Sequence, residues 1–162
     1  MAKHKEEKTN VMRTLEQKKI PYTAHSYDPD GPIDGVSVAQ TLGQPAERVF
    51  KTLVTKAASG AYYVFDIPVA ENLDLKKAAK AVGEKSIAML PQKELLGLTG
   101  YVHGGCSPVG MKKQFPTVFH ETALGYDTVC VSAGKIGAQV ECDPKALIDL
   151  LRAKTADIIV QI

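Results

Sequence analysis

The sequence has no long apolar run, few cysteines and little net charge, and each shortage excludes a class of protein. Its 162 residues contain no stretch of about 18 consecutive apolar residues, so we expect no membrane-spanning helix. Residues 1–8 are charged and no apolar stretch follows them, so we expect no secretory signal. The three cysteines form no CxxC pair, and we expect reduced thiols in a cytoplasmic protein rather than a disulfide framework.

The small net charge hides an uneven distribution. Lysine and arginine total 20 against 18 acidic residues, a formal net charge of +2 that does not indicate a DNA-binding protein. Between Lys76 and Lys113 there are seven lysines and two glutamates, so this segment carries +5 and the rest of the chain −3. The segment can approach the phosphates of a nucleic acid, or it can be a solvated helix face, which is the commoner case.

What is present is the composition of a globular protein, with 44% hydrophobic and 23% charged residues. A chain of this size buries about 70% of its unfolded surface and needs no disulfide or metal to hold a core. We find no internal repeat and no long linker, and we therefore expect one domain over residues 1–162. Helix and strand signals are interspersed and hairpin signals predominate, which predicts a mixed α+β fold.

Periodicity and turn residues place the elements along the chain. Amphipathic spacing predicts helices over residues 5–19, 37–42, 75–82, 92–96 and 143–154. Alternation and short apolar runs predict strands over residues 22–27, 48–56, 62–69, 127–132, 138–141 and 157–162, with a hairpin turn at 58–60. We expect Thr9 and Asp74 as N-terminal helix caps, and Gly83 and Gly97 as the residues that end helices.

The segment 101–110, YVHGGCSPVG, is the most unusual part of the chain. Its glycines permit a close approach of the backbone to a ligand, and Pro108 restricts Ser107 to extended geometry. Such a loop can direct consecutive N–H groups toward a phosphate or a developing oxyanion, or it can be a tight connecting turn. It is not a P-loop, because Met111 and Lys112 stand where that motif requires Lys and then Ser or Thr.

Metal and thiol chemistry are two further alternatives for this loop. His103, Cys106 and His120 match no zinc-binding spacing and lack a fourth ligand, so we expect neither a metal nor a cofactor. Cys106 can be a nucleophile only with a base beside it, such as His103 or His25. We expect the other two cysteines to be small buried residues of strands.

Lys51 stands out because it alternates with Val49 and Leu53 in an expected strand. If this face points inward, the lysine must pair, extend to solvent or line a polar cavity. If the face points outward, Lys51 has no special role.

Two segments together resemble the YbaK/EbsC family of aminoacyl-tRNA deacylases: RVFKTLV at 48–54 and GGCSPVG at 104–110. The similarity covers nearly the whole chain and includes LDLKK at 73–77 and VSAGKIG at 131–137. The resemblance implies a largely antiparallel, barrel-like sheet with surrounding helices, similar to the editing domain inserted in bacterial prolyl-tRNA synthetases. It also implies a trans-editing enzyme that removes cysteine from mischarged tRNA(Pro), with Cys-tRNA(Cys) as a further candidate substrate.

The resemblance assigns the attacking group to the substrate, whose cysteine thiol would attack its own ester carbonyl and release a cyclic thiolactone and tRNA. The catalytic residues would be Lys51, which would position the terminal adenosine or the ester, and the oxyanion-binding loop residues Gly104, Gly105 and Ser107. Cys106 occupies the variable position of GGxSPxG and would not be a catalyst. The positions expected to bind substrate are Tyr27, Thr52, Cys106, Pro108, Gly110, Ser132 and Gln139.

Two positions depart from the family pattern, since Gln139 replaces an aspartate and Asp34 lies near an aromatic position. Both changes can alter the polarity of the pocket and the amino acid that it accepts. The alternatives are a deacylase for another amino acid such as alanine, a non-catalytic module that binds aminoacyl-tRNA or a synthetase, and a cysteine hydrolase that uses Cys106. The expected partners are mischarged tRNA(Pro) and prolyl-tRNA synthetase, with no role for DNA or a membrane.

Overall fold

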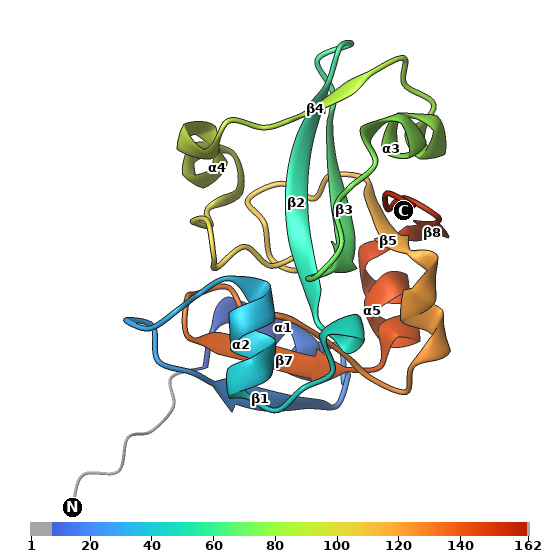
Figure 1. Cartoon of the computed structure of the whole chain (residues 1–162). Coiled ribbons are helices and arrows are strands. Elements are labelled where there is room, and N and C mark those ends of the chain that lie inside the picture. Colours follow the sequence, from blue (N-terminus) through green and yellow to red (C-terminus); the bar gives the residue numbers. More distant parts are fainter. Residues whose placement is uncertain (1–7, 162) are drawn as a thin grey trace, which may run out of the picture.

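The computed structural model describes residues 8–161, which form two β-sheets with helices packed against them (Figure 1). The helices are α1 (Asn10–Gln17), α2 (Gly35–Thr41), α3 (Leu75–Val82), α4 (Gln92–Thr99) and α5 (Pro144–Leu151), with short 3-10 helices η1 (Ala46–Arg48) and η2 (Glu121–Gly125). The strands are β1 (Tyr22–Ser26), β2 (Phe50–Ala57), β3 (Tyr62–Pro68), β4 (Ile87–Met89), β5 (Thr117–His120), β6 (Val129–Ser132), β7 (Ala138–Cys142) and β8 (Lys154–Ala156). None of these helices has the length and hydrophobicity needed to span a membrane.

The two sheets differ in strand direction. One is antiparallel with the order β1–β7–β6, and the other has the order β4–β2–β3–β5–β8, in which β5 runs parallel to β3 and to β8. The remaining four pairings are antiparallel, so the expected mixed α+β, largely antiparallel architecture is confirmed. A β-bridge between Val49 and Cys130 joins the two sheets just before β2 begins.

Helix caps form where the sequence predicts them. The Thr9 side chain accepts a hydrogen bond from the Met12 N–H at 3.2 Å, and Asp74 Oδ1 accepts from two backbone N–H groups at the start of α3. Gly83 ends α3 in the left-handed conformation, with φ 74°. The expected start of the first helix at residue 5 lies outside the described residues.

Two helix ends and the last strand differ from the prediction. Helix α4 continues through Gly97 and ends at Gly100, whose φ of 87° is left-handed and whose N–H donates to the Leu96 carbonyl. Helix α5 ends at Leu151, because Arg152 adopts a left-handed conformation with φ 52°. The chain therefore enters β8 at Lys154, so the strand predicted over 157–162 is placed too late.

Strands β4 and β5 were not predicted from the sequence. Strand β4 has only three residues, and all four residues of β5 are buried in a partly parallel sheet. Such a strand shows no alternation of apolar and polar residues, so the period-two signal fails.

The three-stranded sheet separates a core from the region that holds the candidate site. One face packs on α1 and α5 through Val11, Val140 and Leu147. The opposite face is covered by α2, where Ala39 packs with Cys130 (Figure 1). Because side chains alternate along a strand, this second face also carries the polar residues of β6 and β7.

Candidate active site

A cavity of about 360 Å³ lies where the start of β2 meets α2, the three-stranded sheet and the loop 101–110. Seven of the residues predicted for the site line it: Tyr27, Lys51, Thr52, Gly104, Cys106, Ser132 and Gln139. The other predicted residues belong to the same loop but do not line the cavity: Gly105, Ser107, Pro108 and Gly110. The structure therefore brings together segments that are as much as 112 residues apart, from Tyr27 to Gln139.

Lys51 faces the cavity, which decides between the two orientations that the sequence left open. The side chain is half-buried, and burial lowers the pKa of its ammonium group, an effect that the charge of Glu71 partly opposes. No hydrogen bond or ion pair joins this ammonium group to any residue within 8–161. A half-buried cation without a protein partner can bind an anionic or carbonyl oxygen of a ligand.

The glycines of the loop are needed for packing as well as for access. Gly104 has a left-handed φ of 88°, and a Cβ there would lie 2.9 Å from Ile33 Cδ1. A Cβ on Gly105 would lie 2.9 Å from the backbone nitrogen of Ile136, which cannot move aside without distorting the turn that follows β6. The Gly105 N–H donates to the Val102 carbonyl at 3.0 Å, so this group is already engaged within the loop.

Ser107 is fully buried and its hydroxyl oxygen accepts a hydrogen bond from the Val109 N–H at 3.2 Å. Tyr101 Oη donates to the Val109 carbonyl, which fixes the other side of the same turn. These contacts hold the loop in shape. Ser107 therefore stabilises the loop through its contact with Val109, and its side chain does not line the cavity.

Thr52 Oγ1 lies 2.5 Å from Oδ1 of Asp66, a completely buried carboxyl group opposite Thr52 on β3. Burial raises the pKa of Asp66 to about 8, although the hydrogen bond with Thr52 lowers it somewhat. Sequence reasoning missed Asp66 because it lies within the apolar run of β3. An acidic residue inside such a run was the signal that could have identified it.

Cys106 is buried, and its thiol has a pKa raised to about 12 by burial and by the nearby Asp66. Such a thiol is protonated at neutral pH and is a poor nucleophile. No base is hydrogen-bonded to it among the described residues. His103 is exposed, and His25 Nε2 instead contacts Glu141 Oε1 at 2.7 Å.

Gln139 and Asp34, the two departures from the family pattern, both have structural partners. Gln139 is 5% exposed, and its Oε1 accepts a hydrogen bond from Gln44 Nε2 at 2.9 Å. Asp34 is the N-cap of α2, where its Oδ2 accepts from the Ser37 N–H at 3.1 Å, and this bonding lowers its pKa. An aspartate at the cavity rim is thus explained by the helix that begins beside it.

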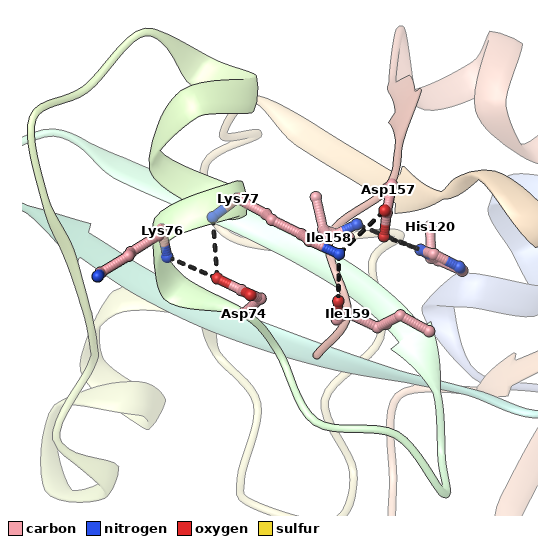
Figure 2. Close-up of polar contacts among 7 residues, drawn as sticks. All are labelled: Asp74, Lys76, Lys77, His120, Asp157, Ile158 and Ile159. Carbon is pink, nitrogen blue, oxygen red and sulfur yellow. Dashed lines mark hydrogen bonds and ion pairs between the residues drawn. The ribbon is translucent and has the colours of Figure 1, made fainter. Parts of the chain in front are cut away.

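His103, Cys106 and His120 do not come together as a metal site in the described part of the chain. His120 is buried on β5, where its Nδ1 accepts a hydrogen bond from the Ile158 N–H at 3.3 Å (Figure 2). Within residues 8–161, ligand-type atoms cluster only at His25, Cys130 and Glu141. There, His25 Nε2 already contacts Glu141 Oε1, and Glu141 Oε2 accepts a hydrogen bond from the Thr128 hydroxyl.

The basic segment from Lys76 to Lys113 does not form one surface. It includes α3 and α4, which lie on different sides of the β2–β4 strands in Figure 1. Lys77 is also engaged, because its ammonium donates to Asp157 Oδ2 and to the Ile159 carbonyl, each at 2.9 Å (Figure 2). The lysines on the α4 side, Lys93, Lys112 and Lys113, are the exposed ones nearest in sequence to the loop 101–110.

Comparisons with known proteins agree with this arrangement. Residues 34–150 match the profile of the aminoacyl-tRNA editing domain. An Enterococcus faecalis protein with the provisional name Cys-tRNA(Pro)/Cys-tRNA(Cys) deacylase EbsC is 47% identical over 160 residues, 98% of each chain. A crystal structure described provisionally as a trans-editing enzyme for prolyl-tRNA synthetase is 28% identical with a TM-score of 0.79, covering 93% of this chain and 95% of that one.

A second crystal structure, of a protein described as hypothetical, supports the fold alone, since it is 22% identical with a TM-score of 0.85. The matched region covers 93% of this chain and 99% of the chain in that crystal structure. The length of the profile match and the identity to the Enterococcus protein together establish the family. The chain belongs to the aminoacyl-tRNA editing domain family, as the YbaK/EbsC resemblance implied.

Proposed function

We propose that this protein is a trans-editing deacylase that removes cysteine from mischarged tRNA(Pro), with Cys-tRNA(Cys) as a second substrate. The observation that carries the proposal is Lys51, a half-buried cation without a hydrogen bond or ion pair to residues 8–161, in a cavity of about 360 Å³. A cavity of this size suits a small ligand such as the aminoacyl end of a tRNA. The Enterococcus relative carries the name of the same activity. As tRNA is the substrate, we expect the protein to act in the cytoplasm.

The reaction that fits this cavity uses the thiol of the substrate. The cysteinyl sulfur attacks the ester carbonyl carbon, a C–S bond forms, and the C–O bond to the terminal ribose breaks. The thiol proton passes to the ribose oxygen, so the products are a cyclic thiolactone and free tRNA. Holding the two reacting groups together can supply about 7–11 kcal/mol of the barrier.

In this mechanism the protein positions the substrate and contributes no nucleophile. Lys51 would hold the ester or the terminal adenosine, and the loop of Gly104, Gly105 and Ser107 would shape the oxyanion site. The thiol of Cys106, with a pKa of about 12, supports a wall-forming role for this residue over the cysteine hydrolase alternative.

A panel of aminoacyl-tRNAs tests the proposal. We would incubate the purified protein with the Cys, Ala, Ser and Pro esters of tRNA(Pro) and with Cys-tRNA(Cys), and measure release of the amino acid. We expect rapid loss of the Cys esters with thiolactone as product, and slow loss of the others, which lack an internal thiol. Equal rates on Ala and Cys esters would indicate an editing enzyme for another amino acid. Tight tRNA binding without turnover would indicate a non-catalytic binding module.

We further propose that prolyl-tRNA synthetase supplies the selectivity for tRNA(Pro). The exposed lysines near the loop, Lys93, Lys112 and Lys113, offer charge for an acceptor end but no means of reading an anticodon. Adding the synthetase to the assay should raise the ratio of the rates on Cys-tRNA(Pro) and Cys-tRNA(Cys). An unchanged ratio would contradict this partnership and leave the deacylase proposal intact.

A further inference from the structure

Asp66 is a buried carboxyl group with an unused oxygen next to the cavity. It lies on β3 between two strands, opposite Thr52 of β2 and Phe119 of β5. Its Oδ1 is 2.5 Å from Thr52 Oγ1, and its Oδ2 has no hydrogen-bond partner within residues 8–161. A fully buried carboxylate with one unsatisfied oxygen is costly, and a neutral carboxyl group there costs much less.

The surroundings of Asp66 favour this neutral form. The groups that face it are Thr52 from β2, Phe119 from β5 and Cys106 from the loop, and of these only the Cys106 thiol titrates. Helix α4 contributes the apolar Leu95 to the same side of the sheet. Burial raises the pKa of Asp66 to about 8, so the group is mostly protonated at neutral pH.

No described cation pairs with Asp66. Lys51 is next to Thr52 in the sequence, but side chains alternate along a strand, so it points to the other face of β2. Within residues 8–161, Asp66 forms no ion pair. Its protonation state therefore depends mainly on burial and on Thr52.

The protonation state of Asp66 decides what the Thr52 hydroxyl can offer to a ligand. An ionised carboxylate only accepts hydrogen bonds, so Thr52 must then donate its single hydrogen to Asp66. A neutral carboxyl group can donate its own hydrogen to Thr52 Oγ1, and the hydroxyl hydrogen of Thr52 is then free to point elsewhere. Thr52 lines the cavity, so this hydrogen has a place to go.

We infer that neutral Asp66 is a positioning residue, which donates to Thr52 Oγ1 and turns the Thr52 hydroxyl hydrogen toward the ester carbonyl of the bound aminoacyl group. The inference rests on the proposed deacylase function. Thr52 is then a second hydrogen-bond donor to the developing oxyanion, in addition to the loop. When Asp66 ionises, the Thr52 hydroxyl must donate to Asp66 instead, and the oxyanion loses this donor. The contribution of Thr52 to deacylation should therefore weaken as the pH rises through the range in which Asp66 ionises.

The test compares Asp66→Asn with the wild type in single-turnover deacylation of Cys-tRNA(Pro) between about pH 6.5 and pH 9.5. An asparagine NH₂ group can donate to Thr52 at every pH. The ratio of the variant rate to the wild-type rate cancels the titration of the substrate thiol. We expect a ratio within a few-fold of one at neutral pH, rising about tenfold by one pH unit above the Asp66 pKa. A ratio that does not change with pH overturns the inference.

Thr52 variants keep the test decisive if Asp66→Asn does not fold. We expect the ratio of the Thr52→Val rate to the wild-type rate to be well below one at neutral pH and to rise toward one as Asp66 ionises. Thr52→Ser should recover most of the rate lost in Thr52→Val, with a ratio that does not change with pH. A matched control is Thr55→Val, since Thr55 also lies on β2 but is fully buried and donates to the Tyr63 carbonyl. For this control the ratio to the wild-type rate should not change with pH, and a Thr52→Val ratio that also stays constant with pH overturns the inference.

These outcomes are distinguishable from failure of the proposed function. Active wild-type protein with a pH-independent ratio refutes only the role of Asp66. Wild-type protein that deacylates none of the Cys esters at neutral pH refutes the deacylase proposal, and the role of Asp66 with it.

Discussion

Two half-buried lysines of this protein, Lys51 and Lys77, have opposite surroundings. Lys77 on α3 donates to Asp157 Oδ2 and to the Ile159 carbonyl, so its charge fastens the C-terminal segment to the helix (Figure 2). Lys51 on β2 has no such partner within residues 8–161, and its ammonium group faces a cavity. Burial alone therefore does not distinguish a structural lysine from one that is available to a ligand. The partners of the ammonium group do.

The largest effect should come from Lys51→Met. The substitution keeps the length of the side chain but removes the cation, and we expect the kcat/KM for Cys-tRNA(Pro) to fall on the order of 100-fold. Because the charge has no protein partner to lose, the melting temperature should stay the same or rise slightly. Steady-state kinetics and thermal unfolding on the same sample measure both. Full activity of Lys51→Met would show that the ammonium group of Lys51 does not act on the substrate, and the functional difference between Lys51 and Lys77 would be lost.

Lys77→Met should show the reverse pattern. Losing two hydrogen bonds of the ammonium group should lower the melting temperature by about 2–4 °C. The kcat/KM of the folded protein should remain unchanged, because α3 does not line the cavity. A loss of activity comparable to that of Lys51→Met, measured well below the melting temperature, would show that the two lysines are not functionally distinct.

Cys106→Ala tests whether Cys106 only lines the cavity or acts as a catalytic nucleophile. The alanine keeps a small apolar side chain in the packing with Val54 and Val64, and we expect activity within about threefold of the wild type. The unaltered protein should also react slowly with thiol reagents at Cys106 under native conditions. If folded Cys106→Ala is inactive, the cysteine hydrolase alternative becomes the better explanation.

The smallest effect concerns the second polar cluster, at His120. Its Nδ1 accepts from the Ile158 N–H, and burial lowers its pKa below the usual value, although Asp157 opposes this. The unfolded chain then binds the proton more readily, so stability is fully present above about pH 6.5 and is lost as the pH falls below it. We expect the melting temperature of the wild type to drop more on acidification than that of His120→Asn. Equal drops would show that His120 does not contribute.

The sequence was most informative where local chemistry determines structure. Thr9 and Asp74 cap helices as expected, because a side-chain oxygen before a helix satisfies free N–H groups wherever that helix packs. Gly97 misled, since a glycine can end a helix but need not, and open space surrounds it within α4. The buried strand β5 depends on its neighbours, which no local pattern shows.

The site was predictable in part. The inward placement of Lys51 and six further cavity-lining residues followed from the family resemblance. The hairpin turn at 58–60 would also have been enough to pair Thr52 with Asp66 by counting residues back from it. The burial of this pair was not predictable. It depends on the loop 101–110 and β5, which come from distant parts of the sequence and cover the hairpin only in the folded chain.

The bridge between Val49 and Cys130 has a mechanical consequence. It is the β-bridge by which the two sheets meet in the described chain, and it lies two residues before Lys51. A ligand held by Lys51 on one sheet and by Ser132 or Gln139 on the other would span this joint. The bound aminoacyl end would then connect the two sheets beside the bridge, so occupied protein should be more resistant to unfolding than empty protein.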